Sequence, residues 1–258
     1  MTLRATLPAL ALALAACASA PPPLPDAQVL VFGEQHDQPD HQRQTAQAVA
    51  QLAAEGRLAA LVIEMAERGR SSAGLPRDAN AAQVREALAW SGWEWPAYEG
   101  VVMTAVRAGV PVLGGNLPRA QMRAAMADAG RDALLDAGVR EKLASAVRDG
   151  HCGLLPAAQE PGMVRIQIGR DQSMAETVAA ALRPGQRVVL LTGAQHASRD
   201  RGVPLHLSLR EGAPSTHVVI FGPGANGLAA DELRSAKFKP RPDPCEGLAE
   251  RLKKKPAA

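Results

Sequence analysis

Short apolar runs recur along the chain and alternate with longer, more polar stretches. Five runs rich in Val, Ile and Leu are bounded by glycine, proline or polar residues, and this pattern predicts buried strands. The runs cover residues 28–32, 59–63, 110–113, 187–192 and 216–221. A helix is predicted after the first run, because Asp37 can cap its start, Pro39 stands in its first turn and Gly56 ends it. Buried strands separated by helices indicate an α/β fold with a mainly parallel sheet flanked by helices.

Two long segments between the runs lack a strand pattern. Residues 71–108 hold the three tryptophans and the single tyrosine of the chain, and residues 118–182 are mostly helical in pattern. We interpret the stretch from about residue 71 to residue 182 as a helical cap subdomain over the sheet. The α/β domain then spans residues 28–222, and residues 223–258 form a C-terminal extension with a basic tail.

The first residues have the form of a lipoprotein signal. Leu7 to Ala16 is an apolar run of about ten residues, whereas a spanning helix needs ~20, so it fits a secretory signal. The run ends in Leu-Ala-Ala-Cys17, which has the form of a lipobox. We expect a signal peptide at residues 1–16, a lipid on Cys17 and a proline-rich tether at residues 17–27. The alternative is an ordinary signal peptide that is cut elsewhere, with Cys17 incidental.

This signal predicts where the protein resides. A lipid on Cys17 would anchor the chain to a bilayer in the cell envelope. Ala18 stands where an Asp would mark retention in the inner membrane, so lipoprotein sorting favours the periplasmic face of the outer membrane.

Composition narrows the class of protein further. The part after the signal peptide has about 240 residues, which suits one large α/β domain, and 47% of the chain is hydrophobic. The net charge of +3 is too small to indicate a nucleic-acid partner. Two thiols remain besides Cys17, and an oxidising periplasm favours a disulfide between Cys152 and Cys245. The alternative is two buried free thiols.

Candidate chemistry gathers where the predicted strands end, which is the edge at which open parallel sheets bind ligands. A Gly-x-x-His segment follows the first run and another follows the fourth, while a glutamate follows the second. A glycine there could take a positive φ and turn the histidine back over the sheet. The side chains that would converge are Glu34, His36, Glu64 and His196. Such a set suits a divalent metal or a general acid/base pair, and the alternative is a structural polar network.

A helical tract at residues 163–175 could add to a ligand cavity. Met163, Gln167, Arg170 and Met174 fall on one helical face. From there Arg170 could pair with a carboxylate such as a haem propionate. Alternatively the methionines pack in the core and Arg170 pairs with Glu34 or Glu64.

Two further side chains are candidate iron ligands. Tyr98 belongs to the aromatic cluster at residues 90–98, and a tyrosine can ligate haem iron. The alternative is that the aromatic residues only fasten the cap to the sheet. His151 beside Cys152 is either a second axial ligand or a residue that orders a turn.

Several strings of the sequence resemble those of a known family. They lie, in matching order, at residues 29–41, 61–65, 111–119, 151–152, 169–175 and 190–207. They are similar to the ChaN-type lipoproteins, described as haem-binding and iron-regulated, in a wider Tiki/TraB-like superfamily. The resemblance covers residues 28–209. Gln35 departs mildly from the usual apolar or Thr residue within the first Gly-x-x-His segment.

The resemblance implies roles for particular residues and for the whole protein. Glu34, His36, Glu64 and His196 match the polar centre of the superfamily, Arg170 and Asp171 match its Arg-Asp pair, and Tyr98 matches an aromatic position of the cap. It implies a protein that binds haem for iron acquisition rather than an enzyme. An exposed haem face would favour a homodimer. The alternatives are a metal-dependent hydrolase, since superfamily relatives include such enzymes, and a scaffold with a vestigial site.

Overall fold

The computed structural model describes residues 23–36, 38–222, 227–240, 242–248 and 250. Within them the chain forms one six-stranded sheet, in which all neighbouring strands are parallel and the order is β3-β2-β4-β1-β5-β6. The strands are β1 (Val29–Glu34), β2 (Leu58–Glu67), β3 (Val112–Asn116), β4 (Arg187–Gly193), β5 (Thr216–Phe221) and β6 (Glu232–Arg234). The α/β fold and its five predicted strands are confirmed.

Some expectations differ from the structure or fall outside it. Strand β6 was not predicted, because its three residues contain no apolar run. The signal peptide, Cys17 and Asp37 lie outside the described residues. Gln38 occupies the capping position of the first helix and makes no side-chain capping hydrogen bond there.

The central strands β1, β2 and β4 are buried on both faces, which explains their continuous apolar runs. In β1, Leu30 and Phe32 belong to one core cluster, whereas Val29 and Val31 belong to another on the opposite face. Successive strand residues point to opposite faces, so one uninterrupted run supplies both cores.

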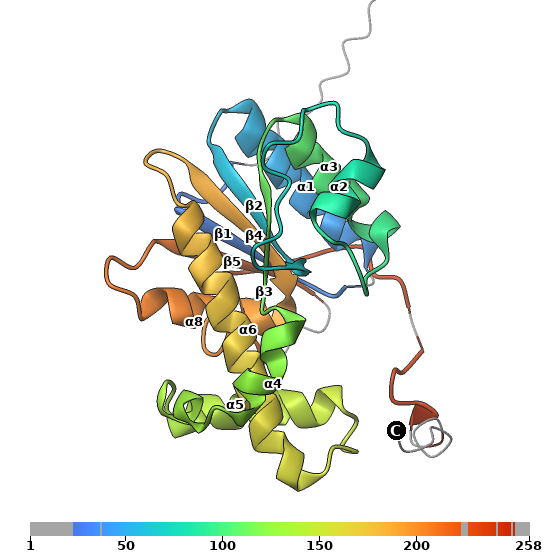
Figure 1. Ribbon diagram of the computed structural model, residues 1–258, viewed down its shortest axis with the longest axis vertical. Helices are drawn as coiled ribbons and strands as arrows, with labels where there is room; N and C mark the ends of the chain where they lie inside the picture. The colour runs from blue at the N-terminus through green and yellow to red at the C-terminus, as the bar shows by residue number, and fades with distance from the viewer. Residues whose placement is uncertain (1–22, 37, 223–226, 241, 249, 251–258) are drawn as a thin grey trace, which may run out of the picture.

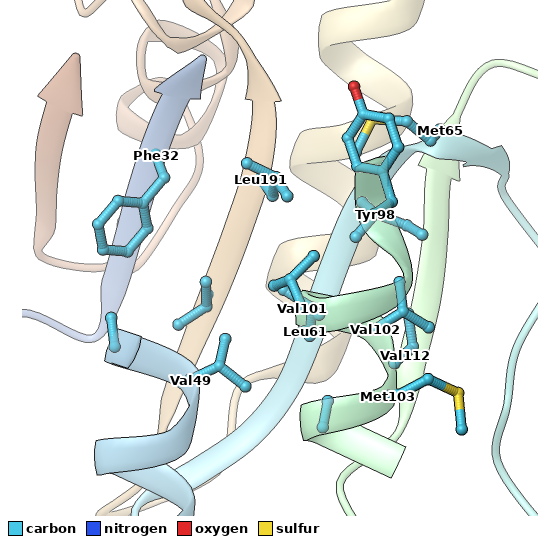
Figure 2. Packing of buried hydrophobic residues seen from close by; sticks show 14 of the residues in the cluster. Phe32, Val49, Leu61, Met65, Tyr98, Val101, Val102, Met103, Val112 and Leu191 are labelled. Atoms are coloured by element: carbon cyan, nitrogen blue, oxygen red, sulfur yellow. The ribbon is translucent and has the colours of Figure 1, made fainter. Parts of the chain in front are cut away.

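Three helices cover the first face of the sheet. These are α1 (Pro39–Ala54), α2 (Ala81–Ala87) and α3 (Trp95–Arg107). They bury residues such as Val49, Val84 and Val102 against the sheet. Figure 2 shows part of this core, with Leu61 and Leu191 of the sheet facing Val101 of α3.

The other face is covered mainly by the C-terminal half of α6 (Glu160–Ala181), with α7 (Ala194–Ala197) and α8 (Val203–Ser208) beside it. The N-terminal half of α6 extends past the sheet, where α4 (Arg119–Ala127) and α5 (Ala137–Gly150) lie near it (Figure 1). The two segments expected as one cap therefore do not form a single layer: residues of α3 and α6 pack in different cores on opposite faces. The reason is that each is an ordinary connection between parallel strands, and such connections cover either face.

The C-terminal extension returns to the body of the domain. After β6, a disulfide joins Cys245 to Cys152, which follows α5, with a Cα–Cα distance of 5.5 Å. The predicted pairing of these two thiols is confirmed. Among the described residues, no helix combines the length and apolar character needed to cross a membrane.

Candidate functional site at the carboxyl edge of the sheet

The two Gly-x-x-His segments lie side by side, because β1 and β4 are neighbours and Glu34 pairs in register with Gly193. Neither glycine takes a positive φ, so that expectation is wrong. The glycines are needed for close approach instead. A Cβ on Gly33 would lie 2.6 Å from Cβ of Ala197, and a Cβ on Gly193 would lie 2.9 Å from Nε2 of His36. Each glycine therefore makes room for the segment that carries the other.

Substituting Gly33→Ala tests this close approach. The added methyl group would meet the Ala197 side chain and the backbone of Ala194 at 3.2 Å. We expect the free energy of unfolding to fall by about 1–3 kcal/mol, as for other overpacked cores. Gly100→Ala is the matched control, since a Cβ there meets nothing within 4 Å and alanine favours the helix. Urea unfolding of both variants decides the point, and equal stabilities would contradict it.

Glu64 lies at the centre of the site and is fully buried at the end of the apolar part of β2. Its Oε1 accepts from Arg170 at 2.5 Å, and its Oε2 accepts from the hydroxyl of Thr192 and the N–H of Gly193, both at 2.7 Å. Burial alone would raise the pKa of Glu64. The charges of His196, His36 and Arg170 and the N–H of Gly193 outweigh burial and hold this pKa well below its ordinary value.

His36 lies on one side of Glu64. The centroid of its ring is 4.5 Å from the centroid of the Trp93 ring. Its Nδ1 lies 2.9 Å from Oε1 of Glu34, and its Nε2 lies 3.9 Å from Oε1 of Glu64. Burial alone would lower the pKa of His36, but the hydrogen bond with Glu34 and the charge of Glu64 raise it. For Glu34 burial is the largest influence and raises the pKa, while hydrogen bonds from His36 and Tyr98 act against it.

His196 stands on the other side in an equivalent arrangement. Its Nδ1 lies 2.6 Å from Oδ1 of Asp171, and its Nε2 lies 3.9 Å from the same Glu64 oxygen that His36 faces. When such a ring is neutral and donates from Nδ1 to its carboxylate, its lone pair is left on Nε2. The two imidazoles therefore face one carboxylate oxygen with the nitrogen that can bind a metal or accept a proton.

A pocket of about 500 Å³ opens over this centre. The sheet edge contributes His36, Glu64 and His196, while α5 and the turn after it contribute a more apolar wall. That wall consists of Leu143, Ala146, Val147, Gly150 and His151. The volume lies within the range of small-molecule sites, and the mixture of apolar lining and few polar groups is typical of them.

Comparison with known proteins identifies the family. The family model described as "Haem-binding uptake, Tiki superfamily, ChaN" matches residues 22–207. The chain belongs to this family. No curated protein matches the sequence. Among solved structures, one of ChaN from Campylobacter jejuni with cofacial heme binding is similar, with a TM-score of 0.64 and 22% identity over 79% of this chain and 85% of that one.

Two more distant structures also align with this ChaN-family chain. The type III effector HopBA1 has a TM-score of 0.40 and 14% identity over 78% of this chain and 79% of its own. A mutant of the erythromycin esterase EreC in its open conformation has a TM-score of 0.45 and 13% identity over 76% of this chain and 70% of its own.

Three of the residues expected at the ligand do not line the 500 Å³ pocket of this ChaN-family protein. Tyr98 is 1% exposed, and its hydroxyl donates to Glu34 at 2.8 Å (Figure 2 shows its ring among the core residues). Met174 is buried in the core beside Thr192. Arg170 makes the alternative contact, an ion pair with Glu64, and also donates to Asn116 and Gln167. Each of the three side chains packs behind the residues that line the pocket. Their polar groups bond to other protein groups and are not directed at a ligand.

A divalent metal does not fit the donors present. Among the described residues, no three His, Cys, Asp or Glu side chains are arranged to hold a metal ion. Glu64 already accepts from Arg170, Thr192 and Gly193, and the two Nε2 atoms are 3.9 Å from it. A metal would have to displace Arg170 to use this carboxylate.

Two parts of the site could not be found from the residue pattern alone. Asp171 was named only through the family resemblance, although it lies four residues after Gln167 and shares its helical face, and both line the pocket. Apart from His151, which was a candidate axial ligand, the wall from α5 was not anticipated. Its residues follow an ordinary amphipathic pattern, and only the path of the chain brings them opposite the sheet edge.

Proposed function

We propose that this ChaN-family protein binds haem in the 500 Å³ pocket and serves haem and iron acquisition. The observation that carries the proposal is that three histidines line one pocket with their Nδ1 atoms already engaged. His36 and His196 face Glu64, whereas Nδ1 of His151 lies 2.7 Å from the carbonyl oxygen of Val147. A carbonyl only accepts, so Nε2 of His151 keeps the lone pair that an iron requires.

The pocket suits an amphipathic macrocycle. Leu143 and Val147 offer apolar contact to a porphyrin face, while the imidazoles occupy positions from which iron can be ligated. Bound haem supplies iron for transfer, and the chain's own residues hold and orient it. Of these histidines, His151 is the one that would hold the haem iron, because no described residue competes for its Nε2. Tyr98 is excluded as a ligand unless the core opens.

A haemin titration of residues 18–258 tests this function. We expect a saturable Soret shift whose affinity falls by about tenfold, or 1.4 kcal/mol, in His151→Ala. Tyr98→Phe is the matched control and should leave the Soret spectrum unchanged. Absence of any saturable shift would overturn the haem proposal. A shift that disappears only in Tyr98→Phe would overturn the choice of ligand.

Anchoring and assembly form the rest of the proposal. A lipid on Cys17 would tether the protein to the bilayer, on the periplasmic face of the outer membrane, and a homodimer would cover an exposed haem face. The mature protein should carry the mass of a diacylglyceryl group, and Cys17→Ser should move it to the soluble fraction. The mass of the haem complex in solution distinguishes a dimer from a monomer.

A second candidate is a metal-independent hydrolase. Two imidazoles, each backed by a carboxylate, face the same Glu64 oxygen at 3.9 Å, and such a pair can supply a general acid and a general base. On this hypothesis a panel of esters contains a substrate whose turnover is lost in both His36→Ala and His196→Ala. If haem binding and turnover are both absent, the remaining alternative is a scaffold with a vestigial site.

A further inference from the structure

The wall of the pocket formed by α5 is held differently from the sheet edge that it faces. Leu143, Ala144 and Val147 of α5 pack with Val164 and Ile168 of α6 in a small core cluster. That cluster contains no residue of the sheet. The wall therefore rests on α6, with Leu205 of α8 beside it, and not on the sheet, so that a movement of the wall relative to Glu64 would disrupt neither main core.

Two fastenings tie α5 across the pocket. Near its middle, Nζ of Lys142 lies 2.7 Å from Oδ2 of Asp200. The two side chains are 50% and 26% exposed, and ion pairs of this kind contribute little. After its end, the disulfide joins Cys152 to Cys245. His151, next to Cys152, lines the pocket. The covalent fastening thus acts at the pocket end of the wall.

The disulfide leads back to the sheet through a segment that we call the belt, the described residues 232–240 and 242–245. It begins as β6, which pairs with β5. Gln38 then holds the belt by donating to the carbonyl of Lys239 at 3.0 Å and accepting from its N–H at 2.7 Å. Asp40 accepts from the N–H of Lys237 at 2.8 Å. In Figure 1 the belt, in red, runs from the sheet toward the α4–α5 end of the molecule.

The backbone at the fastening is in an unfavourable conformation. Cys152 has a φ of +56°, which is rare for a residue with a side chain, and Gly153 follows at +67°. Such a conformation persists where the surrounding structure enforces it. Releasing the disulfide removes one of the constraints that hold the turn after α5 in place.

We propose that α5 is a hinged wall of the pocket and that the Cys152–Cys245 disulfide is the latch that keeps it closed. A dithiol opens the latch by thiol–disulfide exchange: its first thiolate attacks one sulfur of the disulfide and releases the other cysteine as a thiolate, leaving a mixed disulfide. Its second thiolate then attacks the reagent's own sulfur in the mixed disulfide and releases the remaining cysteine, and both cysteine thiolates take up a proton. The products are two cysteine thiols and the oxidised reagent. The role of the latch in ligand release rests on the proposed haem function.

Hydrogen exchange of residues 18–258 tests the hinge without any ligand. At exchange times too short for global unfolding to contribute, we expect deuterium uptake in residues 137–150 to rise several-fold in Cys152→Ser/Cys245→Ser and in dithiothreitol-reduced protein, with β4 unchanged. Gln38→Ala, which removes two of the hydrogen bonds that hold the belt but keeps the disulfide, should raise the same uptake to a smaller extent. Gln51→Ala is the matched control, since the side chain of Gln51 donates to Glu55 near the other end of α1. Unchanged uptake in α5 overturns the hinge, and a uniform rise across the protein shows a general stabiliser and also overturns it.

Haem release separates failure of the latch from failure of the proposed function. If the protein binds haem, transfer of haem to an excess of apomyoglobin should be several-fold faster from Cys152→Ser/Cys245→Ser than from Gln51→Ala. Equal rates would overturn the latch while leaving haem binding intact. If no variant binds haem, the proposed function fails, and the exchange of α5 still decides whether the wall is hinged.

Discussion

Glu64→Ala should lower the free energy of unfolding by about 3–5 kcal/mol, because it leaves Arg170 partly buried without its carboxylate. The substitution also removes the acceptor of Thr192 and Gly193. For a chain of this size the melting temperature should fall by about 10 °C. Thermal and urea unfolding of residues 18–258 measure the change.

Two further variants make this prediction specific. Glu64→Gln keeps the shape and part of the hydrogen bonding, so its stability should lie between those of the wild type and Glu64→Ala. Glu55→Ala removes an exposed carboxylate and should change stability by less than about 0.5 kcal/mol. If Glu64→Ala and Glu55→Ala lose the same amount, the buried centre does not stabilise the domain.

The pH dependence of the Glu64→Ala effect follows from the two shifted pKa values. The depressed pKa of Glu64 stabilises the fold fully above its ordinary value of 4.5, and this stability is lost as the pH falls toward the folded pKa. The raised pKa of His36 stabilises the fold fully below 6.5, and this stability is lost as the pH rises through the folded pKa. The difference between the wild type and Glu64→Ala should therefore be largest between pH 4.5 and 6.5.

Removing the disulfide is the second change with a large expected effect. The bond closes a loop with a sequence separation of 93, for which the chain-entropy model gives about 4–5 kcal/mol of stabilisation. We expect Cys152→Ser/Cys245→Ser to melt about 10 °C below the oxidised wild type. Calorimetry with and without dithiothreitol measures the difference.

The reducing agent supplies the control for that experiment. Reduced wild type should melt close to the double variant, and dithiothreitol should not change the double variant further. If the oxidised and reduced wild type melt together, the bond constrains only the end of the chain and does not stabilise the domain.

The absence of an accessible tyrosine changes how a haem complex of this protein should be interpreted. Tyr98 is the single tyrosine of the chain, and its hydroxyl is held by Glu34. A tyrosinate ligand would require breaking that hydrogen bond and exposing part of the first core. If haem binds, we therefore expect the absorbance spectrum of a histidine-ligated iron. The histidine we expect is His151, which makes no contact with Glu34 or Glu64.

The sequence alone determined the α/β class, five of the six strands, and the Glu34, His36, Glu64 and His196 members of the polar centre. The strands could be located because burial on both faces requires uninterrupted apolar runs, and Gly-x-x-His after two of them placed His36 and His196 at one edge. The Cys152–Cys245 pairing followed from there being two thiols besides Cys17. These features depend on local sequence pattern or on the number of cysteines, so they can be predicted from a single sequence.

Only the tertiary structure decided which groups face a ligand. Tyr98, Met174 and Arg170 have suitable chemistry, yet packing places each behind the site. Leu143 and His151 line the pocket although their local sequence is that of an ordinary helix and turn. Gly33 and Gly193 are required because two segments that are distant in sequence approach each other closely there. Neither glycine is required for a positive φ. Side-chain access depends on long-range packing of β1, β4, α5 and α6, and no local period of the sequence encodes it.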